Sequence, residues 1–119
     1  TLEAGVAPRF RLKAEPFRYQ SQQEYDQARV RKYRLTFPSP VKTEIEVNNT
    51  VHAEYFQPAG SEKKPAVVVL HILGGDFLLS RTIANHLAQN GIAALFVKMP
   101  YYGPRRDPAN PQRVPGSKP

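Results

Sequence analysis

The sequence contains no cysteine, which excludes disulfide bonds, thiolate zinc sites and cysteine nucleophiles. Histidine is scarce as well: His52, His71 and His86 lie far apart and show no metal-ligand spacing, so no metal site is expected. Long apolar runs are also missing, because no stretch approaches the roughly 18 consecutive apolar residues of a membrane-spanning helix. A membrane partner is therefore not expected either.

The N-terminal segment lacks the marks of a targeting sequence. The stretch TLEAGVAPRFRLK has no apolar region after its basic residues, so no signal peptide is visible. The chain also begins without methionine, and we expect a processed or excerpted product. Cytoplasmic and exported locations both stay open.

The net charge of +7 is concentrated at the two ends of the chain. Residues 1–34 hold eight Lys or Arg and four Asp or Glu, residues 35–99 hold five of each, and residues 100–119 hold four against one. We therefore expect a domain at 33–99 between a basic extension at 1–32 and a Pro/Arg-rich tail at 100–119. Six prolines in the tail block helix and sheet, so it is expected to be a solvated loop. No nucleic-acid partner is expected, because basic and aromatic residues are not interleaved on an ordered element.

The first half of the chain predicts one short helix and three strands. Ser21 followed by Glu24 resembles a capping box and predicts a polar surface helix within residues 21–33. A first strand is expected in YRLTF. The segments KTEIEV and TVHAEYFQ alternate apolar and polar residues on either side of Asn48 and Asn49, which predicts an antiparallel hairpin.

The second half predicts a parallel βαβ unit. The apolar runs AVVVLHIL and IAALFVKMP are typical of strands buried on both faces of a sheet. Between them, residues 77–91 have helical periodicity and end at Asn90-Gly91, a strong helix stop. An apolar stripe is expected to face the sheet and a polar stripe of Arg81, Asn85 and Gln89 to face solvent. The apolar stripe consists of Leu79, Ile83, Ala84, Leu87 and Ala88.

The stretch HILGGDFLLS lies where the first parallel strand meets its crossover helix, the usual place of ligand sites in open α/β sheets. The motif GGDFLL lacks the third glycine of a dinucleotide fingerprint and the Gly-Lys-Ser/Thr ending of a phosphate-binding loop, so no nucleotide cofactor is expected. An oxyanion hole, in which backbone N–H groups stabilise a tetrahedral acyl intermediate, requires no missing residue. On the local pattern a tight turn at Gly74 and Gly75 stays open as the alternative.

The ordered segments PAVVVLHILGGDF and IANHLAQNGIAALFVKMPYYGPR resemble the first half of α/β hydrolases of the dienelactone-hydrolase or acyl-esterase type. The resemblance covers roughly residues 33–106. It implies an α/β fold that holds the N-terminal half of a hydrolase sheet, an antiparallel hairpin followed by a parallel βαβ unit, incomplete by itself. The implied activity is cleavage of a small-molecule ester or related acyl bond by a serine nucleophile.

The resemblance assigns roles to three groups of residues. It implies oxyanion-hole residues at Gly74, Gly75, Asp76 and Phe77, although the loop departs from the compact His-Gly-Gly-Gly form and leaves the donor open. It implies that His71 orients this loop, with a buried structural histidine as the alternative. Asp76 is expected to cap the following helix through the N–H of Leu78 or Leu79. The substrate entrance is expected at Tyr101, Tyr102, Arg105 and Arg106, with a solvated arginine pair as the alternative.

The catalytic residues themselves are not found. None of the five serines is framed as in the nucleophile motif G-x-S-x-G, which in this family follows the next strand. The resemblance therefore implies that the nucleophile, acid and base lie outside this chain, in a continuation or in a second chain that completes the domain. A non-enzymatic α/β module, which docks a partner through an open sheet edge and basic tails, stays open as the alternative.

Overall fold

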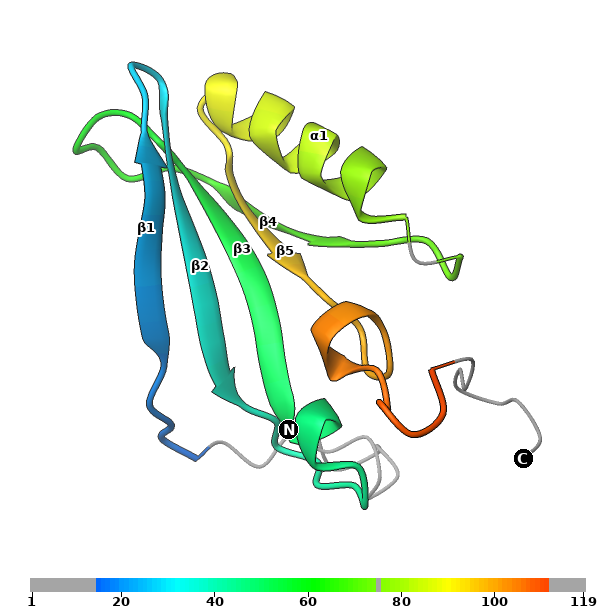
Figure 1. Ribbon diagram of the computed structural model, residues 1–119. Coiled ribbons are helices and arrows are strands. Elements are labelled where there is room, and N and C mark those ends of the chain that lie inside the picture. Colours follow the sequence, from blue (N-terminus) through cyan, green and yellow to red (C-terminus); the bar gives the residue numbers. More distant parts are fainter. Residues whose placement is uncertain (1–14, 75, 112–119) are drawn as a thin grey trace, which may run out of the picture.

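The computed structural model describes residues 15–74 and 76–111 of the chain. It contains one mixed sheet of five strands with the order β1-β2-β3-β5-β4, and a single helix, α1, covers one face of it (Figure 1). The strands are β1 (Gln20–Asp26), β2 (Val30–Pro38), β3 (Thr50–Pro58), β4 (Ala66–Leu70) and β5 (Ala93–Val97). The helix α1 spans Phe77–Gln89, and two short 3-10 segments, η3 (Glu46–Asn49) and η4 (Gly103–Arg105), lie below the sheet.

The helix predicted within residues 21–33 is wrong. This segment forms β1, a turn and the start of β2, and the two strands pair antiparallel with a bulge near Glu24. Glu24 accepts ion pairs across the strands from Lys32 at 2.9 Å and Arg34 at 3.0 Å. The segment has no apolar stripe that would hold a helix against the sheet, so strand pairing overrides the capping-box signal. Residues 20–26 and 30–32 consequently belong to the sheet.

The predicted hairpin is half right. The second segment is β3, but its antiparallel partners are β2 and β5. The first segment, KTEIEV, forms a loop and η3 because side chains occupy its backbone groups: Asn49 accepts from the Thr43 N–H at 2.7 Å and donates to the Thr43 carbonyl at 2.9 Å. Asn and Thr side chains compete in this way with strand pairing.

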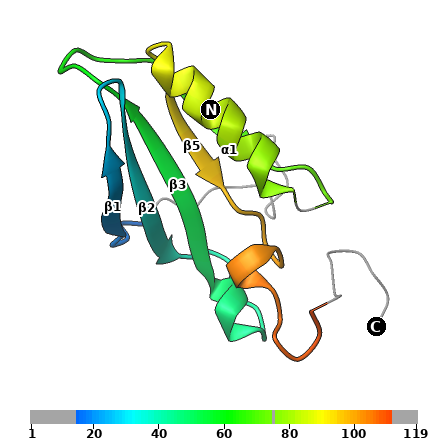
Figure 2. The same cartoon turned by 45° about the horizontal axis from the view of Figure 1, so that its top comes forward.

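The predicted βαβ unit is confirmed. β4 and β5 are parallel and adjacent, and α1 connects them across one face of the sheet (Figure 2). Gly91, in the left-handed region at φ 85°, ends the helix as expected. Burial of both strands is confirmed only for β5. Within the described chain β4 is an edge strand that pairs with β5 alone, and Val67, Val68 and Leu70 are exposed.

The helix packs on the sheet through two alanines, with Phe77 and Leu87 partly buried beside them. Ala84 and Ala88 are fully buried against Val30, Phe56 and Phe96 of the sheet. Leu79 and Ile83, predicted to face the sheet, are instead about half exposed, whereas the predicted polar Arg81 lies over the sheet. Small side chains allow a helix to approach a sheet closely, which explains the rotation.

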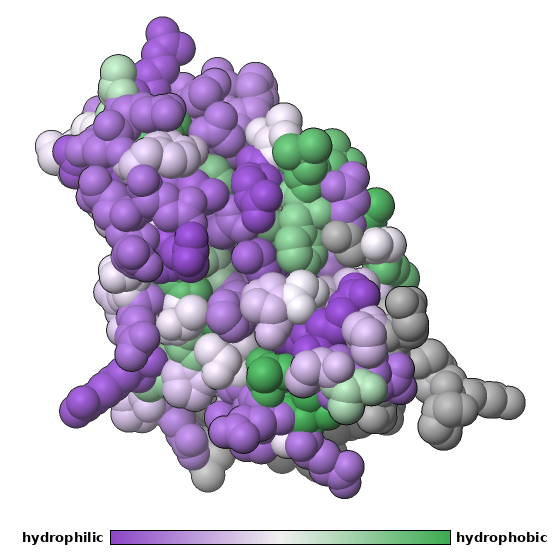
Figure 3. Space-filling model, viewed as in Figure 1, coloured by the Kyte–Doolittle hydropathy of each residue, from purple (hydrophilic) through white to green (hydrophobic). Residues whose placement is uncertain are grey.

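The two sides of the molecular surface differ in polarity. In the view of Figure 3 apolar surface gathers over the region of α1, whereas the surface over β1 and β2 is mostly hydrophilic. On α1 itself Leu78 is 70% exposed and Leu79 50% exposed. No helix in the described part of the chain is long and apolar enough to span a membrane.

Candidate functional site

The loops that follow the two parallel strands lie at the same end of the sheet, where both strands have their carboxyl ends (Figure 1). The loop after β4, residues 71–76, leads into α1, and the segment after β5, residues 98–106, ends in η4. The carboxyl ends of parallel strands are where open α/β sheets bind ligands, and the N-terminus of α1 adds its positive dipole end. The carboxyl end of the parallel strands is therefore the candidate site.

His71 connects the two loops. Its ring is buried, Nδ1 lies 2.8 Å from the carbonyl oxygen of Ile72, and Nε2 accepts the Met99 N–H at 3.0 Å. Accepting at Nε2 assigns the proton to Nδ1, which then donates to Ile72. The imidazole thus uses both nitrogens on backbone groups and joins the loop after β4 to the segment after β5.

Tyr102 makes a second connection between the same loops. Its hydroxyl donates to the carbonyl oxygen of Leu73 at 2.6 Å, and its ring packs against His71 with centroids 4.8 Å apart. Gly103, at φ 56°, lies so close to Phe77 that a Cβ atom would come within 2.6 Å of the ring. Close packing of the two loops therefore depends on glycine at this position.

The start of α1 is arranged as the sequence predicted. The Asp76 carboxylate accepts the Leu78 N–H at 2.9 Å and caps the helix, which confirms its predicted capping role. Phe77 packs against Phe96 with ring centroids 5.7 Å apart. Gly74 is exposed, and a Cβ atom there would meet only an ordinary contact with Ile72 at 3.8 Å. Gly75 lies outside the described residues.

The predicted entrance residues divide into two structural groups. Arg105 is buried, and its guanidinium donates to the carbonyl oxygens of Asn48 at 2.7 and 3.1 Å and of Lys98 at 3.2 Å. The alternative of a solvated arginine pair is therefore wrong for Arg105. Tyr101 and Arg106 are half-buried at the same end of the sheet, and the Tyr101 N–H donates to the side chain of Asn48 at 2.8 Å.

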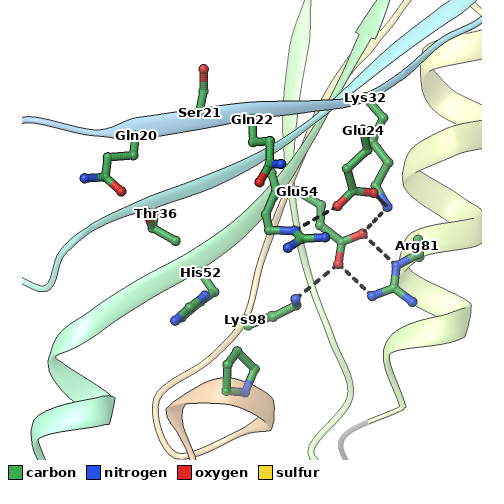
Figure 4. Close-up of a pocket in the computed structure, with 12 residues that line it drawn as sticks. Gln20, Ser21, Gln22, Glu24, Lys32, Thr36, His52, Glu54, Arg81 and Lys98 are labelled. Atoms are coloured by element: carbon green, nitrogen blue, oxygen red, sulfur yellow. Dashed lines mark hydrogen bonds and ion pairs between the residues drawn. The ribbon is translucent and has the colours of Figure 1, made fainter.

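A buried carboxylate that the sequence did not reveal lies at the centre of the sheet face under α1 (Figure 4). Glu54 pairs with Arg81 at 2.6 and 2.7 Å, with Lys32 at 2.8 Å and with Lys98 at 3.3 Å. Burial alone would raise the pKa of Glu54, but hydrogen bonds from Arg81 and Lys32 and the charges of Lys32 and Lys98 lower it to about 2. In the sequence Glu54 is marked by its place among the apolar residues of β3, and nothing there indicates its partners.

The described residues do not assemble a catalytic triad. The Ser39 hydroxyl donates to the Val41 carbonyl, and Ser80 is buried on the face of α1 that packs on the sheet. His52 lies on β3 and His86 on α1, and no hydrogen bond joins either ring to a serine in the described part of the chain. No group of three metal-ligating side chains occurs within residues 15–74 and 76–111. The loops at the candidate site can position backbone N–H groups. The described part of the chain shows no nucleophile that would react beside them.

Two acetyl xylan esterases of known structure resemble this fold. Acetyl xylan esterase 1 from Thermoanaerobacterium sp. JW/SL YS485 matches with a TM-score of 0.56 and 17% identity, over 75% of this chain and 26% of the esterase. The acetyl xylan esterase from Paenibacillus sp. R4 matches with a TM-score of 0.54 and 21% identity, over 75% of this chain and 28% of that one. No protein-family model and no curated protein matches the sequence.

These likenesses concern the fold alone. The five-stranded mixed sheet with its single helix is similar to a fragment of an esterase α/β fold. The chain spans about a quarter of the length of the two esterases.

Proposed function

We propose that this chain is part of a serine α/β hydrolase that cleaves an ester or related acyl bond. In this proposal the loop at residues 71–77 supplies backbone N–H groups that stabilise the oxyanion of the tetrahedral intermediate. The nucleophile, the acid and the histidine base come from sequence outside the chain. The similarity of the fold to part of two esterases supports the proposal.

The observation that carries the proposal is the double attachment of this loop. Hydrogen bonds through His71 and Tyr102 hold the backbone at Ile72 and Leu73 against the segment after β5. Oxyanion stabilisation requires donors that are positioned before the reaction, because reorientation during the reaction costs free energy. At Gly74, by contrast, no backbone angle or steric contact requires glycine, so its missing side chain leaves the backbone open to a ligand.

The proposed substrate class is a small-molecule ester that enters between the loops of the candidate site. The sequence resemblance to dienelactone hydrolases and acyl esterases favours a small-molecule ester. In the proposal Tyr101 and Arg106 line the entrance, since both are half-buried at this end of the sheet and Arg106 donates to the Pro111 carbonyl oxygen at 2.8 Å. Tyr102 and Arg105 are buried, bind backbone groups and shape the entrance indirectly. No cofactor is needed for acyl transfer through a serine nucleophile.

A labelling experiment tests the division of the catalytic groups. A fluorophosphonate probe should label the complete protein that contains this chain and should leave the isolated 119-residue chain unlabelled. An oxyanion hole without a nucleophile stabilises an intermediate that does not form. Stoichiometric labelling of any of the five serines of the isolated chain would contradict the proposal.

A pair of variants in the complete enzyme tests the oxyanion role. Gly75→Val should lower kcat about a hundredfold and change KM far less, because loss of one oxyanion donor costs about 3 kcal/mol in the transition state. Asp76→Asn is the control, because Asn caps a helix about as well as Asp and most activity should remain. Full kcat in a folded Gly75→Val enzyme would show that the glycines only form a turn, and it would contradict the oxyanion role.

A second candidate function is a non-enzymatic docking module. The exposed edge strand β4 favours it, because an unpaired edge is a template for a strand of another protein. The labelling experiment separates the two functions. A complete protein that binds a partner stoichiometrically but does not react with the probe would favour the docking module.

A further inference from the structure

An open groove of about 1070 Å³ lies on the sheet face that carries α1, beside the helix (Figure 4). Its floor is formed by β1, β2 and β3, and Lys98 and Pro104 close one side. We call it the basic groove. It belongs to the face of the sheet, whereas the proposed oxyanion loop lies at the strand ends.

The floor of the basic groove is polar on all three strands. The strand register aligns Gln20 with Thr36 and His52 in one row, and Gln22 with Arg34 and Glu54 in the next. The same face becomes apolar only under α1. A sheet face that receives another helix is apolar, so the polar rows indicate that water or a polar ligand occupies this groove.

The charges that line the groove do not balance. Four cations, Lys32, Arg34, Arg81 and Lys98, face two carboxylates, Glu24 and Glu54. His52 is the remaining titratable group of the lining, and burial followed by the charges of Lys98, Arg105 and Arg34 lowers its pKa. The neutral form of His52 leaves an excess of two positive charges in the groove.

Several donors in the groove keep capacity for a ligand. The ion pair of Arg34 with Glu24 uses Nε, so within the described chain its two terminal nitrogens remain as donors. Its side chain is 57% exposed. Lys98 lies 3.3 Å from Glu54 and has three ammonium hydrogens to share. Gln20, Gln22 and Thr36 add neutral donors on the floor.

We propose that the basic groove binds a small dianion of the phosphate class, a phosphate monoester or inorganic phosphate, with Arg34 and Lys98 as its principal ligands. A phosphate monoester carries a charge of about −1.5 to −2 near pH 7, which matches the excess of two positive charges. Its three acceptor oxygens suit an arginine, a lysine and neutral amide donors together. This binding goes beyond the proposed hydrolase activity and does not depend on it.

Calorimetric titration of the complete protein that contains this chain with inorganic phosphate, at constant low ionic strength, tests the proposal. Binding should be saturable with one site per chain. Arg34→Gln and Lys98→Gln should each weaken it about tenfold, as expected for loss of a charge-assisted hydrogen bond. Arg31→Gln is the matched control, because it removes the same charge from the same strand. Arg31 pairs with Asp26 on the opposite face of the sheet. The phosphate affinity of the Arg31→Gln variant should stay within twofold of wild type.

Further ligands decide between the sources and the chemical classes. Tighter binding of phenyl phosphate than of inorganic phosphate would identify a monoester, whereas equal binding would identify the free anion, and both support the proposal. Equal or tighter binding of malonate would overturn the phosphate class. Absence of saturable phosphate binding, or equal weakening by Arg31→Gln, would overturn the site. Arg34→Gln decides if Lys98→Gln fails to fold, because Arg34 is exposed.

Discussion

At the residue scale, the side chains at the candidate site act mainly on backbone. Tyr102 and Arg105 donate to carbonyl oxygens of other segments, His71 accepts the Met99 N–H, and the three residues are buried. A buried donor that reaches a carbonyl satisfies both groups and fixes the distance between two loops. These residues therefore determine where the backbone N–H groups at Gly74 and beyond can lie.

Tyr102→Phe should lower the free energy of unfolding by about 1 kcal/mol, because it removes the hydroxyl that donates to Leu73 and leaves the ring packing in place. Urea denaturation of the complete protein that contains this chain measures the change. Tyr19→Phe is the control, because Tyr19 is 64% exposed and the change should be near zero. Equal stabilities of Tyr102→Phe and wild type would show that the connection to Leu73 is not formed in solution.

Gly103→Ala should lower the free energy of unfolding by about 2 to 4 kcal/mol. A methyl group there meets the ring of Phe77, and the φ of 56° lies in the left-handed region that alanine disfavours. Gly74→Ala is the matched control and should change stability by less than about 0.5 kcal/mol, because its Cβ meets only an ordinary contact. Comparable losses in the two variants would contradict the packing of η4 against α1.

At the scale of elements, Glu54 joins β3 to β2, to α1 and to the segment after β5. The carboxylate belongs to β3 and pairs with cations of β2 and α1 and with Lys98, directly after β5. A buried ion pair contributes little net stability when it forms, but removing one partner leaves the others without compensation. The cluster therefore determines how α1 lies on the sheet more than it adds to stability.

The depressed pKa of Glu54 predicts a loss of stability in acid. Its folded pKa of about 2 lies below the ordinary value of 4.5, so the unfolded chain binds the proton more tightly. The contribution of about 3 kcal/mol is complete above pH 4.5 and is lost as the pH falls through 2. Urea denaturation of the complete protein from pH 7 to pH 2 measures it.

Two variants isolate this contribution. Glu54→Gln removes the titrating group, so the stability difference from wild type should shrink as the pH falls. Glu46→Gln, at an exposed position of η3, should follow the wild-type profile. Parallel profiles of Glu54→Gln and wild type from pH 7 to pH 2 would contradict the depressed pKa.

At the scale of the whole molecule, the sheet is open at one edge and apolar surface continues around it. β4 has one strand neighbour in the described chain. Val67, Val68 and Leu70 of β4 are exposed, as are Leu78 and Leu79 of α1. An exposed apolar edge favours pairing with another strand. Under the proposed function, the remainder of the hydrolase domain covers this edge.

The isolated chain should therefore self-associate, and Val68→Lys should reduce the association by placing a charge on the edge strand. Sedimentation velocity over a tenfold concentration range measures the weight-average mass, which should rise for wild type and stay nearly constant for Val68→Lys. Val41→Lys is the control, because Val41 is 69% exposed and lies in the loop after β2. A monodisperse, cooperatively unfolding wild-type monomer would contradict the proposal that the domain is incomplete.

Local sequence patterns predicted the second half of the fold best. The βαβ unit, the Asp76 cap and the helix end at Gly91 depend on contacts between residues near in the chain, which periodicity and capping residues record directly. The first half was predicted less well. β1 pairs with a strand that follows after a short turn, and its polar residues resemble a surface helix until β2 is placed beside it.

The candidate site was predicted by position but not by contact. The loop after β4, His71 and the segment after β5 were identified from the sequence because strand ends and glycines mark them. The hydrogen bonds of Tyr102 and Arg105, and the meeting of Glu54 with Arg81, join residues up to 57 positions apart. The hydrophobic periodicity of a sequence does not reveal which residues pair at such a separation.

The sequence by itself determined the parallel βαβ unit and the place of the loop between strand and helix, because both arise from local periodicity and turn chemistry. The tertiary structure alone decided which side chains hold that loop, which face of α1 is buried and how the charges of the basic groove are arranged. These features depend on the order and register of the strands, which bring distant residues to one face of the sheet.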